Sequence, residues 1–486
     1  KYRFNDNQSA NPNLIRRFLE RFGTNESRIE VRVAAIIGDG SLNITRNLVS
    51  ALGVDRSIRT RHMHTDISIN FSKNITSQIT DLFNNVRSSL AYQKANIMVW
   101  GQIPDSGSVI HLRFIPVTMW DQQAPGAFNL ETKLVIPIEF EDEHIALLRF
   151  VTIAAAIKLS SKNLSLYTNT LKNDMENAAL GLTRNAEVFS SEDQSAINSC
   201  YASALCVASF PHYDSELLSV ALEHFRTSLS LINQDKVSSE CGHLKKHIGS
   251  ILHIEANKTN DINQFEESMR ALTDALKHLN ADKQPYCWSV TQYRLGLIAY
   301  HKGLDQGDTN LLKSAVDHYK AALKIYNKGS NSLRWAEIMS NFAQALLVLG
   351  GHTQSLEAFA TSANACLSIL EVRSPEKMPL SWASTQNNLG SALFLLGKQT
   401  RNIERLKKAK EAFESCLKIY QNMDAEKLAV AAINNLKRTN EMLTNLEWEQ
   451  TILINVPRDP SGLPEPGEGL TKRNQYMHSP SFRRVS

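Results

Sequence analysis

A repeat of 47 residues constrains this chain more than any other feature. Trp288, Trp335 and Trp382 are each separated by 47 residues. An apolar residue followed by a small one recurs on the same spacing, as Ile248-Gly249, Leu295-Gly296, Phe342-Ala343 and Leu389-Gly390. A fixed period in this range is typical of chains built from stacked supersecondary units. The repeat therefore predicts an interaction protein rather than an enzyme.

Length and composition restrict the alternatives. A chain of 486 residues predicts two to four domains, and a hydrophobic content of 42% is enough for packed cores. The formal net charge of +4 is small for this length, which argues against a nucleic-acid-binding protein. The six cysteines form no CxxC pair and lie in or beside the repeats, so we interpret them as buried thiols in a reducing compartment.

No segment predicts a membrane span or a signal peptide. The longest apolar run, residues 145–159, is short and is interrupted by Arg149 and Lys158. We expect a cytoplasmic protein. The first residue is Lys1 rather than methionine, so membrane attachment is expected only through a segment that this chain lacks.

The N-terminal quarter has the pattern of a small α/β domain. Residues 1–28 predict a short amphipathic lead-in helix. Residues 29–142 predict the order β-α-β-α-β-β-β, with parallel strands first and an antiparallel meander after them. The sequence from Ala95 to Gly101, a polar turn and the sequence from His111 to Phe114 resemble the N-terminal domain of TolB-like proteins. This resemblance implies a fold and a role in protein assemblies, not a reaction.

Residues 143–446 predict a series of helical hairpins. Each second helix follows a polar or glycine-containing loop, and these helices are expected at residues 217–231, 265–279, 311–326, 355–370 and 403–420. A degenerate pair at residues 145–157 and 164–182 is expected to begin the series. The last repeat has Lys437 in place of glycine, which suits a terminal capping helix. Residues 447–486 are predicted to be a mostly disordered tail.

The hairpin register resembles the tetratricopeptide repeat (TPR) family, in the long-loop form found in bacterial proteins that also carry a TolB-like domain. The predicted fold class is therefore α+β multidomain, a small α/β domain followed by an all-α, TPR-like superhelical solenoid. In that family the first helices line a concave groove that binds a protein segment. The resemblance implies that the groove is lined here by Lys246, His247, Tyr293, Arg294, Asn341, Gln344, Asn387, Asn388, Asn434, Asn435 and Arg438.

The asparagines in this set suggest how a groove could bind a peptide. An asparagine side chain both donates and accepts hydrogen bonds, so a row of them can satisfy the backbone of an extended segment without requiring one sequence. Arg294 and Arg438 could bind a carboxylate. The alternative interpretation is structural, with solvated asparagines or asparagines that connect neighbouring helices.

Two other motifs carry weaker hypotheses. Gly38-Asp39-Gly40-Ser41 lies between a predicted strand and a predicted helix, where backbone N–H groups can bind an anion. The spacing fits no nucleotide-binding motif, so a helix-capping turn is the alternative. His243 and His247 stand at a spacing that can bind zinc, but a packed or solvated pair is the preferred interpretation.

The leading functional hypothesis is a non-enzymatic scaffold that binds a protein or peptide in the groove. A second hypothesis is a ligand-sensing regulator that binds a nucleotide or anion at residues 38–41. A third is a structural subunit that assembles into homo-oligomers. The sequence predicts no catalytic residues, no metal site, no cofactor and no nucleic-acid partner.

Overall fold

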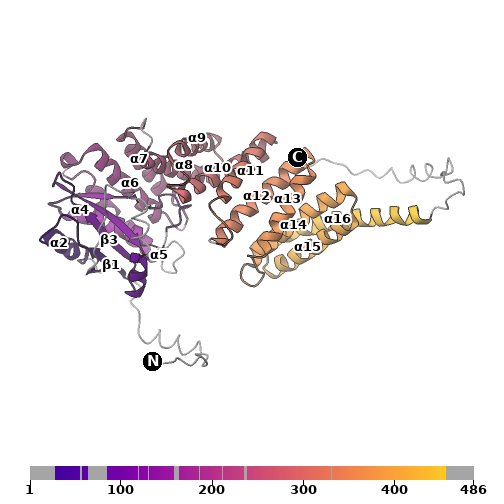
Figure 1. Cartoon of the computed structure of the whole chain (residues 1–486), viewed down its shortest axis with the longest axis horizontal. Coiled ribbons are helices and arrows are strands. Elements are labelled where there is room, and N and C mark those ends of the chain that lie inside the picture. Colours follow the sequence, from indigo (N-terminus) through magenta and orange to yellow (C-terminus); the bar gives the residue numbers. More distant parts are fainter. Residues whose placement is uncertain are drawn as a thin grey trace, which may run out of the picture. The chain divides into compact units, whose positions relative to one another are not determined.

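A computed structural model describes residues 28–455 except residues 55–56, 64–84, 119, 130, 158–163, 185, 211, 235–237 and 330. The predicted lead-in helix falls outside the described residues. The chain divides into two compact units, Lys1–Ser330 and Asn331–Ser486, and each is considered by itself (Figure 1).

The first unit begins with a five-stranded sheet. Its strands are β1 (Ile29–Ala34), β2 (Ile58–Met63), β3 (Ile97–Gln102), β4 (Val109–Pro116) and β5 (Leu134–Pro137). Their order across the sheet is β2-β1-β3-β4-β5. β1 pairs parallel with β2 and β3, whereas β3-β4 and β4-β5 pair antiparallel, which confirms the predicted parallel start and meander.

Both faces of the central strands are buried. Along β3, Ile97 and Val99 join the core that contains helix α2 (Asn43–Leu52) and helix α4 (Asp142–Ala156). Met98 and Trp100 point to the other face, where they pack against Val86 and Leu90. This double burial explains why β3 is a continuous apolar run rather than an alternating one.

One core joins the sheet to the helices that follow. It includes Phe114 and Val135 of the sheet, Phe150 of α4, and Tyr201 and Phe225 of later helices. Phe150 and Tyr201 lie with ring centroids 5.5 Å apart. The predicted boundary at residue 143 thus falls in the first turn of α4, a helix that belongs to this shared core.

The rest of the described chain is helical. In the first unit the helices are α5 (Leu164–Leu180), α6 (Ser191–Ala208), α7 (Ser215–Ser230), α8 (Ser239–Thr259), α9 (Ile262–His278), α10 (Pro285–Gln306) and α11 (Thr309–Leu323). In the second unit they are α12 (Ser332–Thr353), α13 (Leu356–Leu370), α14 (Pro379–Thr400), α15 (Ile403–Asn422) and α16 (Glu426–Asn455). From α7 to α15 each second helix begins 47 residues after the previous second helix. The 47-residue period of the sequence therefore corresponds to one helical hairpin.

The recurring glycine has a packing reason. A Cβ atom at Gly296 would lie 2.6 Å from the ring of Tyr319, and one at Gly390 would lie 2.7 Å from the ring of Phe413. Glycine therefore lets the two helices of a hairpin approach closely over a large side chain. Where the first helix carries Ala343 instead, the residue 23 positions later is the smaller Cys366.

The C-terminal prediction needs one correction. Helix α16 continues to Asn455, so a disordered tail does not begin at residue 447. The apolar period fades there because residues 447, 448, 450 and 451 are exposed, although the backbone stays helical. Residues 456–486 lie outside the described part. Among the described residues no helix is long and apolar enough to cross a membrane.

Candidate functional site: a loop of the sheet bound along the repeat helices

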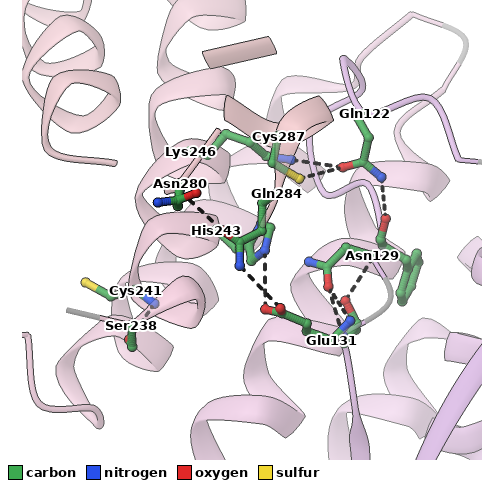
Figure 2. A network of polar contacts seen from close by, with 12 residues as sticks. Gln122, Asn129, Glu131, Ser238, Cys241, His243, Lys246, Asn280, Gln284 and Cys287 are labelled. Carbon is green, nitrogen blue, oxygen red and sulfur yellow. Dashed lines mark hydrogen bonds and ion pairs between the residues drawn. The ribbon is translucent and has the colours of Figure 1, made fainter. Parts of the chain in front are cut away.

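The connection between β4 and β5, residues 117–133, lies against the first helices of three successive hairpins. We call it the β4–β5 loop. Its contacts with α8 and α10 form a polar network that Figure 2 shows from close by. The partners are separated by more than 100 residues in sequence, as in the contacts of Gly126 with His247 and of Gln123 with Arg294.

Three equivalent repeat positions contact the backbone of this loop. Cys200, His247 and Arg294 are each 47 residues apart, on α6, α8 and α10. The thiol of Cys200 donates to the carbonyl oxygen of Lys133 (3.3 Å). Nδ1 of His247 accepts the backbone N–H of Gly126 (3.0 Å), and Arg294 donates to the carbonyl oxygen of Gln123. The loop therefore runs across successive repeats and is held at one register position in each.

Close packing fixes the loop as well. Gly126 has φ +67°, and a Cβ atom there would lie 2.6 Å from Cβ of Cys206 on α6. Phe128 is 1% exposed and packs on the ring of Trp120 at 6.0 Å. The indole of Trp120 donates to the carbonyl oxygen of Ala155 at the end of α4 (2.9 Å). These contacts fix the position of the loop backbone on the helices.

Gln122 brings a lysine and a cysteine together. Nζ of Lys246 and Sγ of Cys287 both reach Oε1 of Gln122, at 3.4 and 3.3 Å (Figure 2). The amide nitrogen of Gln122 donates to the carbonyl oxygen of Phe128 (2.8 Å), which fixes the orientation of the amide. Lys246 is fully buried and Cys287 is 6% exposed. A buried ammonium group is costly unless anionic or polar groups face it.

Glu131 supplies a fixed negative charge at the same interface. Its carboxylate lies 3.7 Å from Nε2 of His243 and accepts a hydrogen bond from Gln284 (3.4 Å). Burial opposes charge on both groups, but the pKa of Glu131 falls to about 2 because His243, Ser239 and Gln284 hydrogen-bond it. The pKa of His243 rises to about 9 against the effect of burial, because Cys287 and Glu131 stabilise the imidazolium. The pair is therefore ionised at neutral pH.

The pKa of His247 is shifted in the opposite direction to that of His243. Burial, together with the positive charges of Lys246, His243 and Arg294, holds its pKa well below the usual value. Its ring stacks on Phe225 with centroids 5.0 Å apart. A neutral imidazole has one nitrogen free to accept, which is what the N–H of Gly126 requires.

The predicted groove residues of the first unit are thus covered by the chain itself. Lys246, His247, Tyr293 and Arg294 are all buried. Lys246, His247 and Arg294 hydrogen-bond the β4–β5 loop. Tyr293 instead packs on the ring of Tyr319 at 5.9 Å.

The predicted residues of the second unit are more exposed. Asn341, Asn387, Asn388 and Asn435 are half-buried, whereas Gln344, Asn434 and Arg438 are exposed. Nδ2 of Asn435 on α16 donates to Oδ1 of Asn387 on α14 (3.2 Å). This bond joins two neighbouring first helices, as the structural alternative expects, while the other asparagines keep partial access to solvent.

The turn at residues 38–41 is closed by its own carboxylate. Asp39 accepts hydrogen bonds from the backbone N–H (2.8 Å) and hydroxyl (2.9 Å) of Thr45 in the first turn of α2. These bonds outweigh burial and lower the pKa of Asp39. The turn therefore has the form that the helix-capping alternative expects, with Asp39 as the acceptor. Because a carboxylate already occupies the helix N-terminus, the turn is unfavourable for a second anion.

Sequence reasoning missed five residues of this network, namely Gln122, Gln123, Gly126, Glu131 and Cys287, and it considered His243 only as part of a histidine pair. Pro125-Gly126 between two strands signals only a turn, and nothing in the sequence pairs it with helices far along the chain. His243 and His247 bind Glu131 and Gly126 respectively, not each other. Within the described residues no three His, Cys, Asp or Glu side chains are grouped so that they could hold a metal ion.

No family model matches the sequence. No curated protein matches it either.

Proposed function

We propose that the chain is a non-enzymatic scaffold that binds an extended protein segment along the first helices of its hairpins. One observation carries this proposal, namely that Cys200, His247 and Arg294 hold the backbone of the β4–β5 loop from equivalent repeat positions. The same register continues through Asn341, Asn388 and Asn435 in the second unit. There the side chains are half-buried.

The side chains at the equivalent repeat positions of the two units can form similar hydrogen bonds with a peptide backbone. Arg294 donates to a backbone carbonyl, and His247 accepts from a backbone N–H. An asparagine side chain can both donate and accept. Asn341, Asn388 and Asn435 could therefore bind either a carbonyl oxygen or an N–H group of a peptide backbone. Recognition of main-chain groups gives affinity with little sequence preference, and side-chain contacts beside them would add specificity.

The experiment is affinity capture from a cell extract with the full chain, followed by mass spectrometry. The variant replaces Asn341, Asn388 and Asn435 with alanine. The matched control replaces Asn364 and Gln421, which are exposed on the second helices α13 and α15. A partner retained by the wild type and the control but lost by the triple variant supports the proposal. Equal capture by all three proteins contradicts it.

Thermal unfolding separates binding from structure. The three asparagine side chains are half-buried and outside the packed core, so the triple variant is expected to melt within a few degrees of the wild type. A large fall in Tm, with the control unchanged, would assign the asparagines to the contact between helices that Asn435 and Asn387 already make.

A second candidate function, self-assembly, is supported by exposed apolar side chains of α16. Val430 and Ile433, which lie three residues apart on one face of the helix, are 56% and 47% exposed. An open hollow of about 680 Å³ on the same helix is lined by Ile433, Leu436, Lys437, Asn440, Glu441, Thr444 and Asn445. Exposed apolar patches of this kind mark contact surfaces.

Sedimentation at several concentrations tests this candidate. Ile433→Lys should shift an oligomer toward monomer, since burying an unpaired ammonium group opposes association. Leu367→Lys on α13 is the matched control, because Leu367 is 52% exposed. A wild-type chain that is monomeric at every concentration would rule self-assembly out.

A further inference from the structure

Helix α16 buries one side and exposes the other. Leu443 and Leu446 of the buried side pack with Leu406 of α15. The opposite side is exposed and carries Val430, Ile433, Lys437, Glu441, Asn445 and Trp448. We call these six residues the outer face of α16. Val430 and Trp448 are 18 residues apart, which is five full turns of an α-helix, so both lie on this side, about 27 Å apart along the axis.

The outer face corresponds to the side of a first helix on which the second helix of a hairpin packs. In α14 a Cβ atom at Gly390 or Gly397 would lie 2.7 or 2.8 Å from a side chain of α15. The residues 47 positions later are Lys437 and Thr444, and both are exposed on α16. No helix follows α16 in the described part of the chain. A helix that packs here would therefore lie on longer side chains than a second helix does.

The outer face is complementary to itself. Lys437 and Glu441 lie two residues to either side of Thr439, and Val430 and Trp448 lie nine residues to either side of it. If two copies of α16 pack antiparallel about a two-fold axis at Thr439, each Lys437 faces Glu441 of the second copy. Each Val430 then faces Trp448 of the second copy. A parallel pair would instead bring like charges together, which opposes association.

Trp448 is held in an exposed position. It is 66% exposed, although large aromatic side chains are usually buried or anchor a contact with a partner. The next residue, Glu449, forms an ion pair with Arg401 at the end of α14. This ion pair fixes the last turns of α16 against its own unit, so the indole remains on the outer face.

We propose that two copies of this chain pair antiparallel through the outer face of α16, with the two-fold axis at Thr439. The inference rests on the self-assembly candidate and specifies its surface. A second copy is the occupant because opposite charges and apolar side chains both meet in this arrangement. A contact between two single helices is smaller than the interface of about 1,200 Å² or more that stable complexes bury, so the dimer is expected to be reversible.

Sedimentation of the full chain at several concentrations tests the charge pairing. Lys437→Glu places like charges against Glu441 twice in each dimer, so the Kd of dimerisation should rise about ten-fold or more. Adding Glu441→Lys to the same chain reverses both charges and should restore the wild-type Kd. Lys408→Glu on α15 is the matched control, because Lys408 is exposed and the change in net charge is the same.

Disulfide crosslinking tests the direction of the two helices. All six native cysteines are buried, so Val430→Cys and Trp448→Cys each add one exposed thiol. Under mild oxidation a mixture of the two variants should form crosslinked dimers that a non-reducing gel detects. Neither variant alone should do so, because in the antiparallel pair two identical positions lie about 27 Å apart.

The outcomes separate the pairing from self-assembly in general. A wild-type oligomer that Lys437→Glu leaves unchanged would overturn the pairing, and so would crosslinks that each cysteine variant forms alone but the mixture does not. In both cases self-assembly through another surface would stand. A wild-type chain that is monomeric at every concentration would overturn both.

Discussion

Arg294 on α10 donates a hydrogen bond to the backbone carbonyl of Gln123, 171 residues earlier in the chain. The contact joins the sheet region to the third hairpin of the helical series. Arg294 is 9% exposed, and its charge also acts on Lys246, His247 and His253 by repulsion. A buried guanidinium needs polar partners, and the carbonyl oxygen of Gln123 supplies one.

Replacing Arg294 with methionine should release the β4–β5 loop. A hydrogen bond from a charged donor contributes about 1.5–3 kcal/mol, so local opening should become at least about ten-fold more frequent. Limited proteolysis should then cut faster within residues 117–133. Arg226→Met is the control, because among the described residues the contact of Arg226 is an exposed ion pair with Glu267. Equal cleavage of both variants would contradict the assigned contact.

Gly126→Ala should destabilise the first unit. Alanine tolerates φ +67° poorly, and its Cβ would lie 2.6 Å from Cβ of Cys206 and 2.9 Å from Cα of Ser203. We expect a cost of about 2 kcal/mol or more and a clear fall in Tm. Gly107→Ala is a matched control, since Gly107 has φ +68° and nothing within 4 Å. Because both glycines have nearly the same φ, the difference in Tm between the two variants reports the effect of the close contact at Gly126 rather than of the backbone angle.

Two helical glycines of the second unit should respond in opposite directions. Gly390→Ala places a Cβ 2.7 Å from the ring of Phe413 and should destabilise by about 1–3 kcal/mol. Gly351→Ala meets nothing within 4 Å, so the better helix propensity of alanine should stabilise by up to about 1 kcal/mol. Thermal unfolding of both proteins provides the measurement. Two changes of the same sign would show that the hairpin contact is not what requires glycine.

His253 should make the first unit sensitive to mild acid. Its ring is 4% exposed and neither nitrogen is hydrogen-bonded among the described residues. Burial, then the charges of Arg294 and His301, lower the pKa to about 3. Because the folded pKa lies below the unfolded value of 6.5, the unfolded chain binds the extra proton, and stability is lost as pH falls below 6.5.

The measurement is the difference in unfolding free energy between the wild type and His253→Leu across pH 7 to 4.5. This difference should fall by about 1.4 kcal/mol for each pH unit below 6.5. His247 adds to the wild-type slope and remains in the variant, so the comparison isolates His253. Parallel curves for the two proteins would show that His253 accepts its proton in the folded state.

The sequence predicts the hairpins well because their determinants are local and repeated. The pair Leu389-Gly390 reports a close helix contact, and its copies set the register of every hairpin. Likewise the apolar run around Val99 predicts a central strand, since both of its faces are buried. These features require no knowledge of distant residues.

The site could be predicted only in part. The resemblance to the repeat family predicted Lys246, His247 and Arg294 as groove residues that bind a protein partner, and that stays a prediction. In the structure these three residues hydrogen-bond the β4–β5 loop. The role of the β4–β5 loop of the same chain was not predictable, because Gln122 and Gln123 follow no periodicity. Cys287 was likewise missed, since only the folded chain brings Lys246 to the same Gln122 oxygen.

The constant spacing of the second helices also bears on how such a chain can change length in evolution. Gain or loss of a whole 47-residue unit returns each later helix to the same neighbours and the same orientation. A one-residue insertion inside a helix instead rotates everything after it by about 100°, because an α-helix has 3.6 residues per turn. Duplication or deletion of whole hairpins is therefore the change in length that the helical part of this chain tolerates best.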